Sequence, residues 1–269
     1  MGSIFYVGKN RDILIASQSK FATPIKHPSR TINEHVISYV NSGEWVLSIG
    51  GETVRAKKDT VFIQPANVPH IGLKDCPPGT HTMFIHLSTA REDRYISNGE
   101  CSLNDQCVYL NNFIDARNNT EIKKTFIKTI EEYAKGNGLK ASAYLNIVLC
   151  ELSESSVSDN SKLSLGMSIK RMIANDISDN LSNKEIAKRM NVGIRTAETT
   201  FKECFGMTIH QYQLKEKIDR ARFCLEYYQD MKIIDISLSL GFYDEYHFSR
   251  QFKKITGLSP TEYRKKLLR

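Results

Sequence analysis

Residues 241–264 read GFYDEYHFSRQFKKITGLSPTEYR, and this stretch decides the fold of the C-terminal part of the chain. Phe248 and Phe252 stand four residues apart, so a helix brings them to one face, which can pack against Ile236 and Leu240 of the preceding segment. The pattern predicts two short helices joined by a tight turn. Such a pair is the helix-turn-helix unit of DNA-reading proteins.

The same unit occurs a second time, earlier in the chain. The segment EIAKRM at 185–190 pairs with DISLSL at 235–240, an offset of 50 residues. The segment AETTFK at 197–202 pairs with FSRQFK at 248–253, an offset of 51 residues. The extra residue therefore falls in the turn between the two short helices. We expect two helix-turn-helix units, at about 183–205 and 233–256, with one long helix over 208–229 between them.

The outward face of the second helix in each unit is the candidate DNA-reading surface, because that helix enters the major groove. Arg195 and Arg250 can each form a bidentate pair with guanine, Glu198 can accept from cytosine, and Tyr246 can contact a thymine methyl or a phosphate. The candidate DNA-binding residues are Arg195, Thr196, Glu198, Thr199 and Lys202 in the first unit, and Glu245, Tyr246, Ser249, Arg250 and Lys253 in the second.

Charge is distributed unevenly along the chain. Residues 1–161 contain 17 Lys and Arg against 17 Asp and Glu, whereas residues 162–269 contain 20 against 13, so the whole net charge of +7 lies in the C-terminal part. A basic module attracts the phosphate backbone of double-stranded DNA, the expected partner. No apolar run approaches the ~20 residues needed to span a bilayer, and no leader is evident, so a cytoplasmic protein is expected.

The N-terminal part is rich in predicted strands. Short apolar runs such as VISYV at 36–40 and WVLSI at 45–49 are separated by turn-forming segments, which favours a small barrel or sandwich. Helical periodicity follows at 121–135 and 141–153. A run rich in Ser, Asp and Asn at 153–161 is typical of an exposed linker. We therefore place an N-terminal domain at 1–155, whose two helices could pack on the strands or on a second copy of the protein, a linker at 156–164 and the DNA-binding domain at 165–269.

Residues 165–269 resemble the C-terminal domain of the AraC/XylS family of bacterial transcription regulators, and the stretch 241–264 follows the family signature almost position for position. The first unit departs from the family pattern. Gly193 stands where a capping Ser is usual, and Ala197 and Thr199 stand where Leu and Arg are usual. A glycine permits the cap geometry but offers no side-chain acceptor. We therefore expect Arg195 and Glu198 to define what the first unit reads.

The N-terminal part resembles the family's cupin-like sensor domain, with the stretch 59–70 echoing a cupin strand pair that ends in His70. The resemblance implies an α+β protein: an N-terminal cupin-like β-barrel with two following helices, and a C-terminal all-α double helix-turn-helix domain. The HxH and Glu ligands of metal cupins are missing, and the six cysteines have no metal-ligand spacing. We expect no metal, no cofactor, and reduced cysteines. His70 is interpreted as a hydrogen-bonded barrel residue.

Three hypotheses remain open for control of the protein. In the first, the barrel binds a small effector that alters DNA affinity or contact with RNA polymerase. The family resemblance implies that the protein is an activator. Some virulence-type relatives bind fatty acids between their two domains, and here the cations that can meet a carboxylate are Lys26, Arg30, Arg55, Lys215 and Lys217.

In the second hypothesis, the N-terminal domain binds no effector and instead docks a partner protein or forms a homodimer through residues 121–153. The third is an enzyme, a metal cupin fused to a DNA-binding domain. The missing ligand set argues against the third, so no catalytic residue is assigned.

Overall fold

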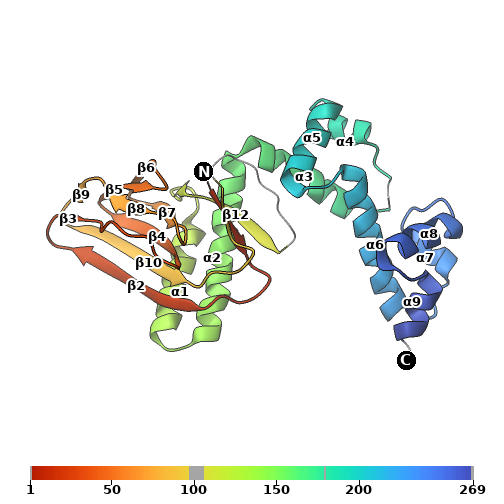
Figure 1. Cartoon of the computed structure of the whole chain (residues 1–269), viewed down its shortest axis with the longest axis horizontal. Coiled ribbons are helices and arrows are strands. Elements are labelled where there is room, and N and C mark those ends of the chain that lie inside the picture. Colours follow the sequence, from red (N-terminus) through yellow and green to blue (C-terminus); the bar gives the residue numbers. More distant parts are fainter. Residues whose placement is uncertain (1, 97–105, 179, 268–269) are drawn as a thin grey trace. The chain divides into compact units, whose positions relative to one another are not determined.

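The computed structural model describes residues 2–96, 106–178 and 180–267, and the chain divides into two compact units, Met1–Ser161 and Lys162–Arg269. The described strands all lie in the first unit together with two helices, and the second unit is built of helices (Figure 1). This is the α+β class that the sequence predicted. Cys101 lies outside the described residues, and the other five cysteines are free thiols.

A five-stranded antiparallel sheet forms the centre of the first unit. Both of its faces are buried, because Ile37 and Tyr39 of β4 join one hydrophobic core and Val40 joins another. In sheet order its strands are β13 (Phe113–Asp115), β7 (Thr60–Gln64), β4 (His35–Ser42), β10 (Thr80–Leu87) and β2 (Ile13–Phe21).

Three smaller sheets complete the β-structure. Trp45 and Leu47 of one of them share a core with Phe62 of the central sheet. Because the described strands pair in four separate sheets, the predicted barrel is open rather than closed. The smaller sheets are β6 (Glu52–Lys57), β5 (Glu44–Ile49) and β8 (His70–Gly72); β11 (Arg94–Ile96), β1 (Gly2–Tyr6) and β12 (Cys107–Asn111); and β3 (Ile25–Lys26) with β9 (Asp75–Cys76).

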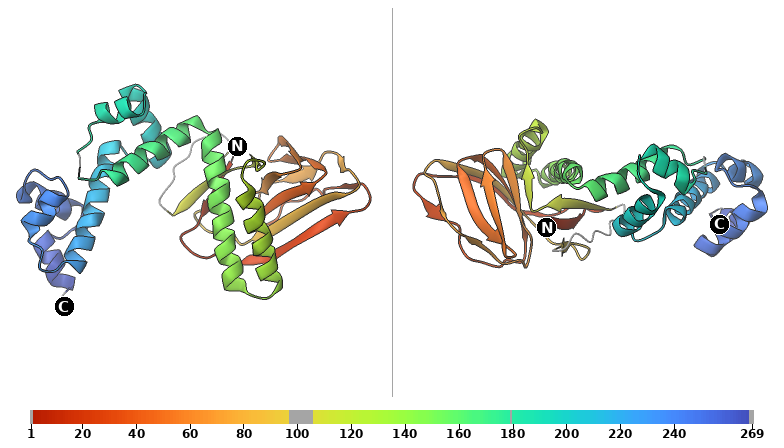
Figure 2. Two further views of the ribbon diagram at one scale, coloured as in Figure 1. Left: turned by 180° about the vertical axis from the view of Figure 1, so that it is seen from behind. Right: turned by 90° about the horizontal axis from the view of Figure 1, so that it is seen from above.

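Two helices cover the other face of the central sheet. They are α1 (Thr120–Ala134) and α2 (Gly138–Asp159), which lie side by side against the strands (Figure 2). Phe126 of α1 and Leu149 of α2 are completely buried in one core with Ile63 and Ile85 of the sheet. This packing explains the helical periodicity of these segments.

The exposed linker predicted at 156–164 is not what the structure contains. Helix α2 continues to Asp159, and α3 (Ser161–Asn175) begins two residues later. Ser155 and Ser156 are accommodated in α2 because their hydroxyls donate to carbonyls of the preceding helical turn. Ser156 is completely buried, where its Oγ donates to Leu152 O at 2.8 Å and accepts from Asn111 N at 2.9 Å.

The second unit contains two helix pairs connected by α6 (Ile209–Tyr227), which runs from one pair to the other (Figure 1). The pairs occupy the residues at which the repeat predicted helix-turn-helix units. The first pair is α4 (Asn183–Arg189) with α5 (Ile194–Phe205); the second is α7 (Ile233–Ser239) with α8 (Glu245–Thr256), followed by α9 (Pro260–Leu267).

The turns of the two pairs differ by one residue, as the repeat offsets predicted. Asn191 in the first turn and Gly241 in the second have positive φ angles of 53° and 70°, a conformation that these two residue types tolerate. Gly193 caps α5 without a side-chain hydrogen bond, as expected from its missing side chain, whereas the side chain of Asp244 caps α8 by accepting from His247 N.

Candidate nucleic-acid interface and effector cavity

The second helix of each pair has an apolar face turned into the domain and an opposite face turned to solvent. Phe201 of α5 and Phe248 and Phe252 of α8 are completely buried. On the outward faces, nine of the ten predicted DNA-reading residues are exposed, and Ser249 is half-buried. They are Arg195, Thr196, Glu198, Thr199 and Lys202 on α5, and Glu245, Tyr246, Ser249, Arg250 and Lys253 on α8.

The two arginines of these faces are free to contact bases. In the described parts of the chain, the guanidinium groups of Arg195 and Arg250 have no hydrogen-bond or ion-pair partner. A free guanidinium can donate two parallel hydrogen bonds to a guanine. Glu198 differs, because its Oε1 accepts from Asn183 Nδ2 at 2.5 Å, so one of its oxygens is already engaged.

A hydrogen-bonded clasp, formed by Asn180, Lys217 and Gly241, ties the two helix pairs together through α6. Asn180 Nδ2 donates to Gly241 O at 2.7 Å, and Asn180 Oδ1 accepts from Lys217 Nζ at 2.6 Å. The Lys217 ammonium lies 5.4 Å from the centre of the Phe242 ring, and the side chain is almost completely buried. The clasp therefore favours one fixed separation of α5 and α8, the two candidate DNA-reading helices.

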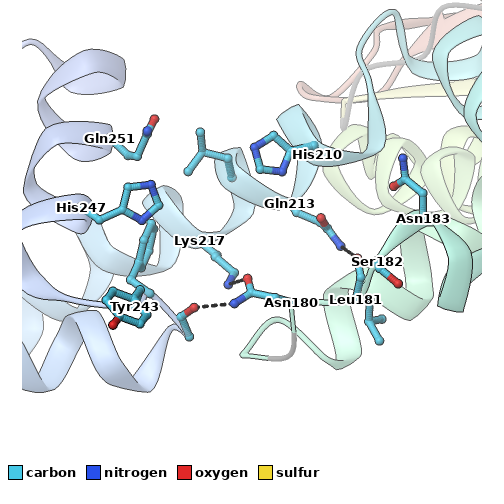
Figure 3. A pocket seen from close by; sticks show the side chains of 13 residues that line it. Asn180, Leu181, Ser182, Asn183, His210, Gln213, Lys217, Tyr243, His247 and Gln251 are labelled. Carbon is cyan, nitrogen blue, oxygen red and sulfur yellow. Dashed lines mark hydrogen bonds between the residues drawn. The ribbon is translucent and has the colours of Figure 1, made fainter.

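A cavity of about 480 Å³ lies beside the clasp (Figure 3). Its walls include His210 and Gln213 of α6 and His247 and Gln251 of α8. The sequence patterns did not single out these residues, because the cavity exists only where α6 and α8 pack, and no motif links positions on separate helices. Its lining also includes Asn183, the partner of Glu198.

A second cavity, of about 310 Å³, lies in the N-terminal unit. Trp45, Phe62 and Phe84 provide aromatic walls, and Lys26 and Arg30 provide cationic groups. Its fifteen lining residues include no Asp or Glu. A small molecule with a ring or apolar body and an anionic group matches this lining.

His27, which lines this cavity, and the neighbouring His70 are both held by hydrogen bonds. His27 Nε2 lies 3.2 Å from the Gln64 amide nitrogen and His27 Nδ1 lies 3.1 Å from Pro28 O, so Nε2 accepts and Nδ1 donates. Burial, aided by His70 and Arg30, lowers the pKa of His27 from 6.5 to about 4. His70 is buried, and its Nε2 accepts from Arg30 Nε at 3.2 Å. His70 is thus a hydrogen-bonded residue, as interpreted from the sequence.

The five predicted effector contacts do not all belong to this cavity. Lys26 and Arg30 line it, whereas Arg55 lies outside it and forms an exposed ion pair with Glu44 at 3.2 Å. Lys215 and Lys217 belong to α6 of the other unit. Lys215 Nζ lies 3.2 Å from Asp219, and Lys217 belongs to the clasp.

In the described ranges, no group of three or more His, Cys, Asp or Glu residues could hold a metal ion. Among those same residues, no helix is long and apolar enough to cross a membrane.

Comparison with protein-family models identifies both units. A model described as a helix-turn-helix domain matches residues 186–266, and a model described as an AraC-like ligand-binding domain matches residues 22–147. The chain belongs to the AraC/XylS family of transcription regulators. This regulator is therefore a DNA-binding protein with an N-terminal ligand-binding domain, and the outward faces of α5 and α8 are its candidate DNA contacts.

Three proteins of known name are similar to this AraC/XylS regulator. It is 21% identical to the Msm operon regulatory protein of Streptococcus mutans over 87% of this chain and 85% of that protein. It is 33% identical to the transcriptional activator RhaS of Yersinia pestis over 35% of this chain and 34% of that protein. A solved structure of ToxT from Vibrio cholerae with bound unsaturated fatty acid aligns over 97% of this chain and 95% of that one, with 15% identity and a TM-score of 0.36.

Proposed function

We propose that this regulator reads a DNA site with α5 and α8 and that a small anionic effector in the N-terminal cavity controls its activity. The proposal that α5 and α8 read DNA rests on the solvent exposure of the predicted DNA-binding residues on the outward faces of these two helices. Arg250 and Arg195 would pair with guanines, and Lys202 and Lys253 would contact phosphates. Activation of transcription through RNA polymerase is the accompanying expectation.

DNA selection tests the reading helices. The full-length protein is incubated with a random-sequence duplex library, the retained fragments are sequenced, and the site is located by footprinting. We expect a site that extends over two major-groove segments about one helical turn apart. Recovery of no enriched sequence, or of a site covering a single major-groove segment, would contradict the proposal.

The lining of the N-terminal cavity supports the effector class. Lys26 and Arg30 supply positive charge without any acidic side chain in the lining, and the aromatic walls fit an apolar body. Arg55 is left out of this site because it lies elsewhere and is paired with Glu44. An effector must bind the DNA-competent state and the other state with different affinities in order to control the protein.

The effector is sought by thermal shift with a panel of small organic acids that includes aromatic acids, sugar acids and medium- and long-chain fatty acids. Trp45 lines the cavity and is the only tryptophan in the chain, so its fluorescence should respond to binding. Arg30→Gln should weaken that response, whereas Arg55→Gln removes an equal charge outside the cavity and should not. Equal losses in the two variants, or no response to any acid, would remove the effector proposal.

Control without an effector remains the second candidate, in which the N-terminal unit forms a homodimer through 121–153 or binds a partner protein. Ile127, Leu139 and Ile147 of this region are exposed apolar residues. Analytical ultracentrifugation of the full chain, with Ile147→Asp as the disrupting variant, tests the dimer.

A further inference from the structure

The cavity beside the clasp carries hydrogen-bond donors that suit an anion. His210, Gln213, Lys217, His247 and Gln251 all contribute groups that can donate hydrogen bonds, and none of the thirteen lining residues is Asp or Glu. A cavity rich in donors and lacking carboxylates is suited to a negatively charged oxygen. An apolar ligand would leave the side chains of His210, His247 and Gln251 without hydrogen-bond partners, at a free-energy cost.

The cavity is lined by the start of α4, by α6 and by the second reading helix, α8, and one of its residues is bonded to the first reading helix, α5. On one side, Asn183 lines the cavity and also donates to Glu198 on the outward face of α5. On the other side, His247 and Gln251 belong to α8 and flank Arg250 in sequence. A duplex that engages both reading helices has its backbone between the two major-groove segments, and this cavity is connected to both helices through these residues.

Some of the donor side chains that line the cavity already have hydrogen-bond partners, and others do not. Lys217 is held by Asn180, and Gln213 Nε2 donates to Leu181 O at 2.9 Å. In the part of the chain that the structure describes, the side chains of His210 and Gln251 have no hydrogen-bond partner. Figure 3 shows His247 and Gln251 on one side of the cavity and His210 on the other, with Lys217 between them. The buried ammonium adds positive charge behind the free donors.

We propose that this cavity binds a phosphate group of the DNA backbone, on the stretch that joins the two major-groove segments, through His210, His247 and Gln251. The proposal rests on the DNA reading proposed for α5 and α8. These contacts carry no sequence information of their own. They position the duplex, so that Arg195 and Arg250 meet the correct base pairs.

The test combines changes in the protein with changes in the DNA. In the selected site, each phosphate between the two major-groove segments is replaced in turn by an uncharged methylphosphonate, and affinity is measured for the full-length protein. The wild type should lose affinity about tenfold at one or two positions, the loss expected for one hydrogen bond to a charged group. The double variant His210→Ala/Gln251→Ala should bind unmodified DNA about tenfold more weakly and lose nothing further at those positions.

Controls separate this result from its alternatives. Gln229→Ala changes an exposed residue outside the cavity and should keep the wild-type pattern. Gln251→Ala alone provides the same comparison if circular dichroism shows that the double variant is not folded. Equal methylphosphonate losses in wild type and variant, or no loss at any position, would overturn the proposal.

A small free anion, such as inorganic phosphate, could occupy the cavity in place of a DNA phosphate. Stabilisation of the DNA-free protein by inorganic phosphate that disappears in the double variant, together with a flat methylphosphonate scan, would assign the cavity to a small anion and overturn the backbone contact. Failure of the wild type to select any DNA sequence would instead overturn the proposed function, before the phosphate scan.

Discussion

Replacement of Gly241 by alanine should selectively destabilise the DNA-binding unit. Gly241 has a φ of +70°, and a Cβ there would lie 2.0 Å from Ser178 O, a contact that requires the backbone to move. A left-handed non-glycine residue costs roughly 1–2 kcal/mol, and relief of such a contact costs about 1–3 kcal/mol more. The expected loss in free energy of unfolding is therefore about 2–5 kcal/mol.

Gly257 provides a matched control for this prediction. Its φ is +81°, and a Cβ there would meet nothing within 4 Å, so Gly257→Ala should incur the backbone cost without the clash. The effect of Gly→Ala on the unfolded chain is common to both variants and cancels in the comparison. The difference between them should be about 1–3 kcal/mol.

Urea unfolding of the full-length variants can separate the two units. The only tryptophan, Trp45, lies in the N-terminal unit, whereas ellipticity at 222 nm reports the helices of both units. Gly241→Ala should shift the ellipticity transition and leave the tryptophan fluorescence transition in place. Equal destabilisation by Gly241→Ala and Gly257→Ala would refute the contact between Gly241 and Ser178 as the cause.

Two further predictions concern base reading and pH. Arg250→Ala should lower specific affinity by roughly 1–3 kcal/mol and relax preference at one base pair, whereas Lys253→Ala should weaken all sequences and reduce the salt dependence by about one ion; an unchanged site preference for Arg250→Ala would show that the reader is misplaced. The folded-state pKa of His27 is lowered to about 4, so the unfolded state binds more protons between about pH 4 and 6.5, and stability should fall as the pH falls through that range. Urea midpoints from Trp45 fluorescence should therefore be lower at pH 5 than at pH 7, with a smaller difference in His27→Gln; an equal or higher midpoint at pH 5 would contradict this.

The linker predicted at 156–164 was wrong because composition was taken as evidence for a loop. The serine-rich run at 153–161 has the composition of a loop, yet Ser155 and Ser156 lie in α2 and bond to carbonyls four residues earlier. Composition alone does not distinguish a hydroxyl that bonds to water from one that bonds to its own helix. Burial of Ser156 against Asn111 of β12 decides the case, and that contact joins residues 45 apart.

The sequence by itself determined the double helix-turn-helix and its outward residues, because both depend on local periodicity and on a repeat within one chain. Phe248, Phe252 and Arg250 already define the inner and outer faces of α8 through their spacing. Only the tertiary structure decided which side chains meet across elements. The clasp of Asn180, Lys217 and Gly241, the pairing of Arg55 with Glu44, and the two cavities all join residues from separate elements, and no local pattern encodes their distances.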